Sequence, residues 1–198
     1  IGTHVSARIP GDEHRFLLNP YGMLFEEITA SNLLTVDLDG NQLTTSDYAF
    51  NRAGFTIHSA VHMNRDDAMF VIHLHTDYGI AVSCQEDGLK PLNQTAIAVY
   101  SDLAYHDYEG VATNLAERER LVEDLGAKNA MILRNHGTMA CGPNAGGAWQ
   151  AIFRLERACR YQILAESGSA TTRSLSVDII DSRASVTSTD ALETRGNF

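Results

Sequence analysis

Two short apolar runs, each followed closely by histidine, constrain the fold of this chain more than any other feature. The first run, Met69–Ile72, leads into a His-Leu-His sequence, and the second, Ala130–Leu133, leads to His136. The first run predicts a buried strand. Residues two apart on a strand point to the same face, so His73 and His75 can aim both imidazoles at one point. The second run predicts another short strand, which delivers His136 on a loop.

Three neutral imidazoles that converge from rigid elements, with one position open for water or substrate, form the ligand set of a catalytic divalent metal site. Zinc is the ion most often held in this way, and Mn²⁺, Co²⁺ and Fe²⁺ are the alternatives. Two histidines on one strand can also be a coincidence, but the third histidine weakens that interpretation. We therefore predict His73, His75 and His136 as the metal ligands.

The charge of the chain limits its partners. The net charge is −10 and the isoelectric point is about 5.1. Nucleic acids and anionic membranes need a cationic surface, so neither is an expected partner. No apolar run approaches the ~18 residues of a membrane span. A small-molecule substrate remains the expected partner.

The cysteines indicate a reducing compartment. Cys84, Cys141 and Cys159 are odd in number and show no C-x-x-C spacing, which is typical of buried thiols and not of a disulfide framework. No signal peptide is recognisable. The chain begins at Ile1 in what looks like the middle of a motif, so we expect upstream residues to be missing. The cytoplasm is the expected location.

Helices and short strands are predicted to alternate along the chain, with hairpin signals near its start. This pattern is typical of an α/β layered domain around one mixed sheet. The predicted elements are a hairpin over 1–18, a short helix over 23–28, strands over 33–38, 69–75, 103–106 and 130–133, helices over 77–84 and 93–102, a helix capped by Asn51 and reaching Asn64, one capped by Thr113 and closed by Gly126, and a long one capped by Asn144 and reaching Glu166.

The last part of the chain differs from the rest. Eleven of the 31 residues 168–198 are Ser or Thr, and the only apolar cluster among them is Val177–Ile180. We therefore expect one folded domain over 1–167. Residues 168–198 would form a weakly packed tail or an arm that contacts a neighbouring subunit.

Six motifs resemble those of the class II aldolase/adducin family, occur in the family's order and cover roughly residues 1–165. The version at 51–55 resembles the adducin-like branch, of which the chain would be the head domain. The motifs are Gly-Thr-His-Val-Ser-Ala-Arg at 2–8, Asn-Pro-Tyr-Gly at 19–22, Phe-Asn-Arg-Ala-Gly-Phe-Thr-Ile-His-Ser at 50–59, Val-Ile-His-Leu-His-Thr at 71–76, Ala-Tyr-His-Asp-Tyr-Glu-Gly at 104–110 and Leu-Arg-Asn-His-Gly at 133–137.

The resemblance implies a three-layer α/β/α domain around one mixed, largely antiparallel sheet, and a homotetramer with active sites at subunit interfaces. The family's metal histidines fall on the same three residues that the spacing selects. Asn19 and Gly22 fall in a family motif and are taken as substrate-binding residues. Tyr108 lies near the family's mobile tyrosine, which protonates the leaving group, and Tyr105 is its competitor.

Two departures from the family matter for the chemistry. The sugar-phosphate aldolases carry a Ser-Ser-Glu triplet before the helix histidine, here His58, and its Glu is the acid/base. That Glu position is Gly54, and the two phosphate-binding serines fall on Arg52 and Ala53. The usual Asn of the first motif is replaced by His4. The chain thus lacks the expected general base and half of the phosphate cradle.

Other polar residues have competing interpretations. Arg52 can anchor a substrate carboxylate through its guanidinium, or it can form a surface or interface salt bridge. His58 and His62 are four residues apart on a predicted helix and can chelate a metal, but the resemblance implies a structural role. His14 and His106 are interpreted as ordinary polar histidines.

The leading hypothesis is a metal-dependent lyase that acts on a small hydroxy- or keto-acid through a metal-stabilised enediolate. Decarboxylation is one version, because it needs no base to deprotonate a hydroxyl. Aldol cleavage with another base, such as His4, is the second. The alternative is a non-catalytic adducin-like binding module that keeps the fold and the metal. A regulatory pseudoenzyme is a third hypothesis that the sequence does not separate from these.

Overall fold

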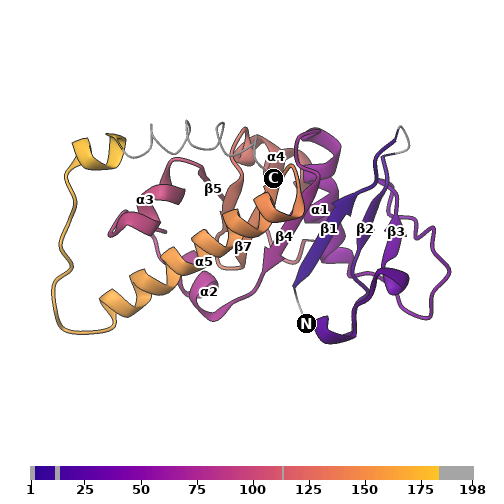
Figure 1. The fold of residues 1–198 in the computed structure, drawn as a ribbon, viewed down its shortest axis with the longest axis horizontal. Helices are drawn as coiled ribbons and strands as arrows, with labels where there is room; N and C mark the ends of the chain where they lie inside the picture. The colour runs from indigo at the N-terminus through magenta and orange to yellow at the C-terminus, as the bar shows by residue number, and fades with distance from the viewer. Residues whose placement is uncertain (1–2, 12–13, 113, 183–198) are drawn as a thin grey trace.

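The computed structural model describes residues 3–11, 14–112 and 114–182 (Figure 1). Its middle layer is a seven-stranded mixed sheet in the order β3-β2-β1-β4-β7-β6-β5. Only β5 and β6 are parallel neighbours, and the other pairs are antiparallel. The strands are β1 (His4–Arg8), β2 (Phe16–Leu18), β3 (Leu34–Val36), β4 (Phe70–Leu74), β5 (Leu103–His106), β6 (Ala130–Leu133) and β7 (Gly137–Gly142).

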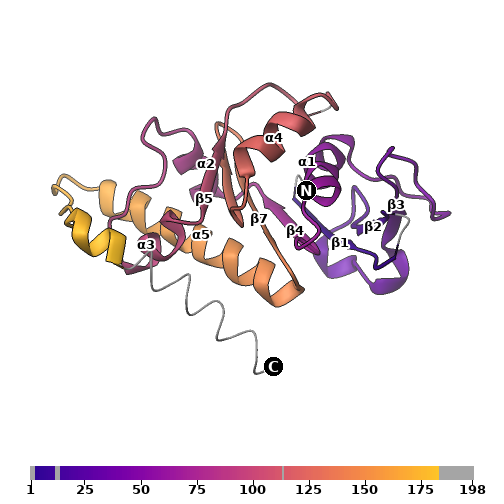
Figure 2. The same cartoon turned by 90° about the horizontal axis from the view of Figure 1, so that it is seen from above.

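Helices cover both faces of this sheet, as the two views in Figures 1 and 2 show. On one face lie α1 (Arg52–Asn64) and α4 (Glu117–Leu125). On the other lie α2 (Asp77–Ser83), α3 (Gln94–Tyr100) and the long α5 (Ala145–Glu166), and two 3₁₀ turns, η1 (Phe25–Glu27) and η2 (Ala30–Asn32), precede β3. The predicted three-layer α/β/α domain around a largely antiparallel sheet is thereby confirmed.

The central strands are apolar on both faces because both faces are covered. On β4, Val71 packs into the core beneath α1 and α4, and Ile72 packs into the core beneath α2, α3 and α5. On β6, Met131 packs into the core beneath α1 and α4, and Ile132 packs into the core on the opposite face. A smaller third core lies under β2 and β3, where Phe16 packs against the start of α1.

The two predicted asparagine caps are confirmed. Asn51 Oδ1 accepts a hydrogen bond from the Ala53 N–H at 3.0 Å, and Asn144 Oδ1 accepts one from the Gly147 N–H at 2.8 Å. Each cap satisfies a backbone donor that has no partner within its helix. The helices that begin at these caps pack against the sheet: α1 contacts β1, and α5 runs along β7.

The strand β7 was not predicted, and it is central. It pairs with β4 on one side and β6 on the other, so all six of its residues are buried. Its sequence, Gly-Thr-Met-Ala-Cys-Gly, is short in β-branched residues and does not alternate in polarity. Its position between two neighbours stabilises it, which is a tertiary effect that local propensity does not report.

Three further predictions need correction. The helix predicted over 23–28 is only the 3₁₀ turn η1, in which no side chain is buried and so no apolar face stabilises a longer helix. The helix predicted from Thr113 begins at Glu117 after Ala116, and Thr113 lies outside the described residues. Cys84 is exposed at the end of α2, whereas the other two cysteines are buried.

The C-terminal segment after α5 lies at the surface of the described structure. None of residues 168–182 is buried. The division into a domain over 1–167 and a tail over 168–198 stays a prediction. Within the described residues, no helix combines the length and the apolar character that crossing a bilayer requires.

Candidate metal centre

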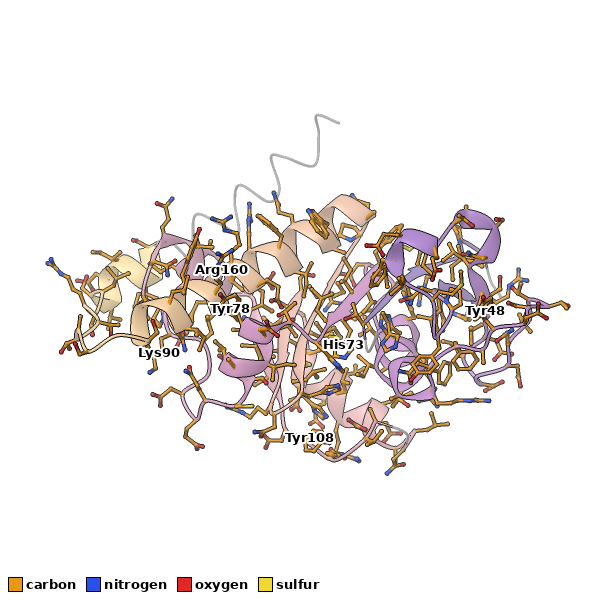
Figure 3. All side chains as sticks on the ribbon, turned by 90° about the horizontal axis from the view of Figure 1, so that it is seen from below. Tyr48, His73, Tyr78, Lys90, Tyr108 and Arg160 are labelled. Atoms are coloured by element: carbon orange, nitrogen blue, oxygen red, sulfur yellow. The ribbon has the colours of Figure 1, made fainter. Side chains whose placement is uncertain are left out.

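The sheet brings the three predicted ligands together. His73 lies near the end of β4, His75 follows that strand directly, and His136 lies in the turn between β6 and β7. Because β7 pairs with β4 with His73 opposite Met139, the turn before β7 lies beside the end of β4. Figure 3 shows His73 in the middle of the molecule. The position of His136 on a connection after β6 was predicted correctly.

The imidazoles face one point. The ring centroids of His73 and His136 are 4.8 Å apart, as are those of His75 and His136, and those of His73 and His75 are 4.7 Å apart. One ligand nitrogen from each ring lies within 4.8 Å of the others. The Nε2 atoms of His73 and His75 are 2.9 Å apart. Two imidazoles on a tetrahedral zinc would place their nitrogens about 3.3 Å apart, so the His73–His75 pair is close to the spacing that such an ion requires.

A backbone hydrogen bond selects the tautomer of His73. Its Nδ1 lies 3.0 Å from the Thr138 carbonyl oxygen, which can only accept a hydrogen bond. Nδ1 therefore carries the proton and donates it, and the Nε2 lone pair faces the other two rings. This is the arrangement that orients a metal-binding histidine.

Burial keeps the triad neutral. Burial, reinforced by the neighbouring rings, lowers the pKa of His73 well below its ordinary value. It lowers the pKa of His136 to about 4 and also lowers the pKa of His75. At pH 7 the rings then offer lone pairs and not positive charge, as metal binding requires. The three residues thus fit a divalent cation in both geometry and protonation.

His4 lies beside the triad, on β1. It pairs with His73 across the sheet, and its ring stacks on the His73 ring with centroids 6.1 Å apart. The side chain is buried, and neither ring nitrogen has a hydrogen-bond partner in the described structure. Burial lowers the pKa of His4 to about 4. A Cβ placed on Gly54 would lie 2.6 Å from His4 Nδ1, so the imidazole fills the space next to that glycine.

His58 and His62 share a different partner. The hydroxyl of Ser6 lies 2.6 Å from Nδ1 of His58 and 2.7 Å from Nε2 of His62. One ring therefore donates to the hydroxyl, and the hydroxyl donates to the other ring. Burial lowers the pKa of His62 to about 4 and that of His58 well below its ordinary value. These two rings face Ser6 and not a common ion.

The two candidate tyrosines have different surroundings. The Tyr105 hydroxyl accepts a hydrogen bond from the Leu89 N–H at 3.0 Å, and the Arg134 guanidinium lies 4.7 Å from the ring centroid. Burial raises the pKa of Tyr105. Tyr108 is 53% exposed, and its ring centroid is 6.3 Å from that of His136. Figure 3 shows Tyr108 at the edge of the molecule, so it, and not Tyr105, borders the triad on the solvent side.

The three predicted substrate-binding residues are more dispersed. Arg52 is the exposed first residue of α1; it donates to the Gly40 carbonyl oxygen at 3.2 Å, and its guanidinium lies 4.9 Å from the Phe50 ring centroid. Asn19 is buried and accepts a hydrogen bond from the Val5 N–H at 2.9 Å, next to His4. Gly22 is exposed with a φ of +92°.

Sequence reasoning missed two sets of carboxylate contacts around the site, one at His106 and one at Glu156. His106, predicted to be an ordinary polar histidine, is buried with its Nδ1 2.7 Å from Asp124 and its Nε2 3.5 Å from Glu117. Burial raises the pKa of Glu117. Glu156 of α5 accepts hydrogen bonds from two threonines that flank the triad. No local pattern signals either contact, because the partners lie 11 to 80 residues apart.

Comparison with known proteins places the chain among relatives of two kinds. Residues 1–163 match the family model described as the class II aldolase and adducin N-terminal domain. A Caulobacter vibrioides protein, named as a candidate class 2 aldolase, is 59% identical over 167 residues, which are 84% of this chain and 65% of that protein. Alpha-adducin of Mus musculus is 38% identical over 173 residues, which are 85% of this chain and 23% of the adducin. The chain thus spans less than two thirds of either relative.

Two solved structures share the fold. An aldolase II superfamily protein from Pseudomonas syringae is 49% identical with a TM-score of 0.89, over 93% of this chain and 75% of that one. L-fuculose 1-phosphate aldolase from Glaciozyma antarctica is 28% identical with a TM-score of 0.82, over 96% of this chain and 72% of that one.

Proposed function

The chain belongs to the class II aldolase and adducin family, and from that premise we propose that it is a metal-dependent carbon–carbon lyase acting on a small hydroxy- or keto-acid. The observation that carries the proposal is the convergence of three neutral imidazoles, those of His73, His75 and His136, on one point. A divalent ion held there would supply Lewis-acid chemistry and take up the negative charge that develops on the substrate oxygens.

His4 is the proposed base where the reaction needs one. In aldol cleavage a base removes the proton of the hydroxyl next to the breaking carbon–carbon bond. The His4 ring is neutral, has no hydrogen-bond partner on either nitrogen, and fills the space beside Gly54. In decarboxylation the leaving group is CO₂ and no hydroxyl proton is removed, so the reaction does not depend on His4. The two versions are therefore separable by a His4 variant.

Tyr108 is the proposed proton donor to the product carbon. Its ring borders that of His136, and half of its surface is open to solvent. A phenol in this position can reach a bound substrate from the solvent side and can exchange its proton with water after each turnover. The packed Tyr105 lacks that freedom, since its hydroxyl is bonded to the Leu89 N–H.

Arg52, Asn19 and Gly22 are the proposed substrate-binding residues. The charge of Arg52 favours a substrate that carries a carboxylate. Arg52 is exposed and is the first residue of α1. Two residues further along the same helix, Gly54 lies against His4. A guanidinium pairs with a carboxylate through two parallel hydrogen bonds. Arg52 and Ala53 stand where the related sugar-phosphate aldolases carry phosphate-binding serines. These substitutions argue against a sugar phosphate as the substrate.

We also propose zinc as the ion, a homotetramer as the active form, and the cytoplasm as the location. An all-imidazole ligand set suits zinc, with Mn²⁺, Co²⁺ and Fe²⁺ as alternatives. The three cysteines are free thiols, which fits a reducing compartment. The family relationship supports the proposed homotetramer.

A non-catalytic binding module is the second candidate, and one observation favours it. Alpha-adducin is 38% identical over 85% of this chain, which corresponds to 23% of the adducin. Such a module would keep the fold without turnover. Turnover of any acid by the purified protein would exclude it, whereas a metal-loaded protein that turns over no acid would favour it.

The test is a screen of non-phosphorylated keto- and hydroxy-acids with the zinc-loaded protein. We expect turnover that EDTA abolishes, and a higher KM in Arg52→Ala than in Arg52→Lys. Arg154→Ala, which removes an exposed arginine from α5, is the control and should match the wild type. Rapid cleavage of fuculose or rhamnulose phosphate by the wild-type protein would overturn the proposed substrate class.

A further inference from the structure

We propose that Glu156 is the positioning residue of the metal centre, because its carboxylate ties together the two chain segments that carry the three histidines. One segment is the end of β4 with His75 and Thr76, and the other is the turn into β7 with His136 and Thr138. The inference rests on the proposed function only in taking the triad to hold an ion. It does not depend on the reaction.

The carboxylate contacts both segments directly. The Thr76 hydroxyl donates to Oε2 of Glu156, and the Thr138 hydroxyl donates to Oε1. Thr76 follows His75 in the chain. Thr138 lies two residues after His136, and its carbonyl oxygen accepts the hydrogen bond from Nδ1 of His73 at 3.0 Å. One carboxylate is therefore linked to all three ligands through two threonines.

Gly79 of α2 lies close to this contact. A Cβ on Gly79 would lie 2.9 Å from Oε1 of Glu156 and 2.7 Å from the Thr76 hydroxyl oxygen. The same hydroxyl accepts the Gly79 N–H at 3.1 Å and so caps α2. Thr138 is completely buried. A side chain at position 79 would displace the carboxylate, so the glycine is part of the arrangement.

The chemistry of the groups makes the contact directional. An ionised carboxylate only accepts hydrogen bonds, so each threonine hydroxyl donates its one hydrogen bond to Glu156. Hydrogen bonds to a charged acceptor are about twice as strong as neutral ones. Since α5 packs along β7 and against α2, the carboxylate holds Thr76 and Thr138 at a set separation. Groups that orient metal ligands in this way change metal affinity by about 10- to 100-fold.

The test is the dissociation constant of Zn²⁺, measured by competition with a chromophoric chelator. We expect Glu156→Ala and Thr138→Val each to weaken binding about 10- to 100-fold. The two together should cost no more than the larger single change, because both remove the same link. Glu166→Ala is the matched control: this carboxylate ends the same helix but pairs with Lys90 at 3.0 Å, and its loss should leave the affinity unchanged.

A second readout separates positioning from general destabilisation. In the metal-free protein, ¹⁵N-detected NMR should show the His73 ring protonated at Nδ1 in the wild type and as a tautomer mixture in Glu156→Ala. Glu156→Gln keeps the shape of the side chain and should fold even if the alanine variant does not. Its Zn²⁺ dissociation constant and its His73 tautomer ratio should lie between those of the wild type and Glu156→Ala.

The outcomes separate the two proposals. A folded Glu156→Ala protein with wild-type affinity and wild-type His73 tautomer would overturn the positioning role. A wild-type protein that binds no Zn²⁺ would overturn the proposed function instead, and the tautomer measurement would still decide the role of Glu156.

Discussion

The imidazole of His4 occupies the space that any side chain at position 54 would need. A Cβ on Gly54 would lie 2.6 Å from Nδ1 of His4 and 2.7 Å from Cε1, closer than nonbonded atoms approach one another. A side chain at position 54 therefore requires the His4 ring to move or to be replaced by a smaller side chain, which couples the two positions.

The effect of Gly54→Ala on the free energy of unfolding should have opposite signs when residue 4 is His and when it is Ala. In the wild type, Gly54→Ala should destabilise the fold, because overpacking typically costs 1–3 kcal/mol. In the His4→Ala background the same change should stabilise the protein by about 1 kcal/mol, which is the helix propensity difference between Gly and Ala. Urea unfolding of the four proteins in the presence of EDTA measures both values. Equal effects in the two backgrounds would show that His4 and Gly54 are not coupled.

The purified protein should carry about one divalent ion per chain. His75→Ala should remove it with little cost to the fold, because His75 is the exposed member of the triad. Elemental analysis measures the ion, and urea unfolding in EDTA checks the fold. His14→Ala, which removes an exposed histidine from the loop before β2, should retain the ion. Full occupancy in His75→Ala would contradict the ligand assignment.

The free energy of unfolding should decrease as the pH is lowered through the range between the unfolded and the folded pKa values of the buried histidines. The folded pKa of His62 is about 4, below its ordinary value of 6.5, because the ring is buried. Between these values the unfolded chain binds more protons, so the free energy of unfolding decreases with decreasing pH. From pH 7 to pH 5, His62 alone should account for a loss of about 2 kcal/mol.

The contribution of His62 is measured with a variant that does not titrate. In EDTA, the loss between pH 7 and pH 5 should be about 2 kcal/mol smaller in His62→Gln than in the wild type. His14→Gln, at an exposed position, should behave like the wild type. An unchanged loss in His62→Gln would mean that this ring is not responsible for the acid sensitivity.

The protein should assemble as a tetramer. Light scattering should then give about four times the chain mass of 21.7 kDa at micromolar concentration. None of residues 168–182 is buried in the single chain, so this segment has surface available for a neighbouring subunit. Truncation after Ser167 should shift the scattering mass downwards if the segment is an inter-subunit arm. A clean monomer from the untruncated chain would contradict the assembly.

Local signals in the sequence determined most of the helices and strands. The caps Asn51 and Asn144 each start a helix where their side chains can accept a backbone N–H, and this requires only neighbouring residues. The apolar runs before His73 and before His136 both form central strands. His73 follows the first run directly and His136 lies three residues after the second, so the sequence indicated the three histidines, but their convergence also depends on the pairing of β7 with β4.

Only the tertiary structure decided what surrounds the triad. β7 is a strand because it lies between β4 and β6, and its own residues carry little strand preference. The contact of His4 with Gly54 joins residues 50 apart in the chain, and that of Glu156 with Thr76 joins residues 80 apart. Such contacts depend on which faces of distant elements meet. A linear pattern reports the periodicity of one element at a time, so it indicates the three histidines but not the distant residues that pack around them.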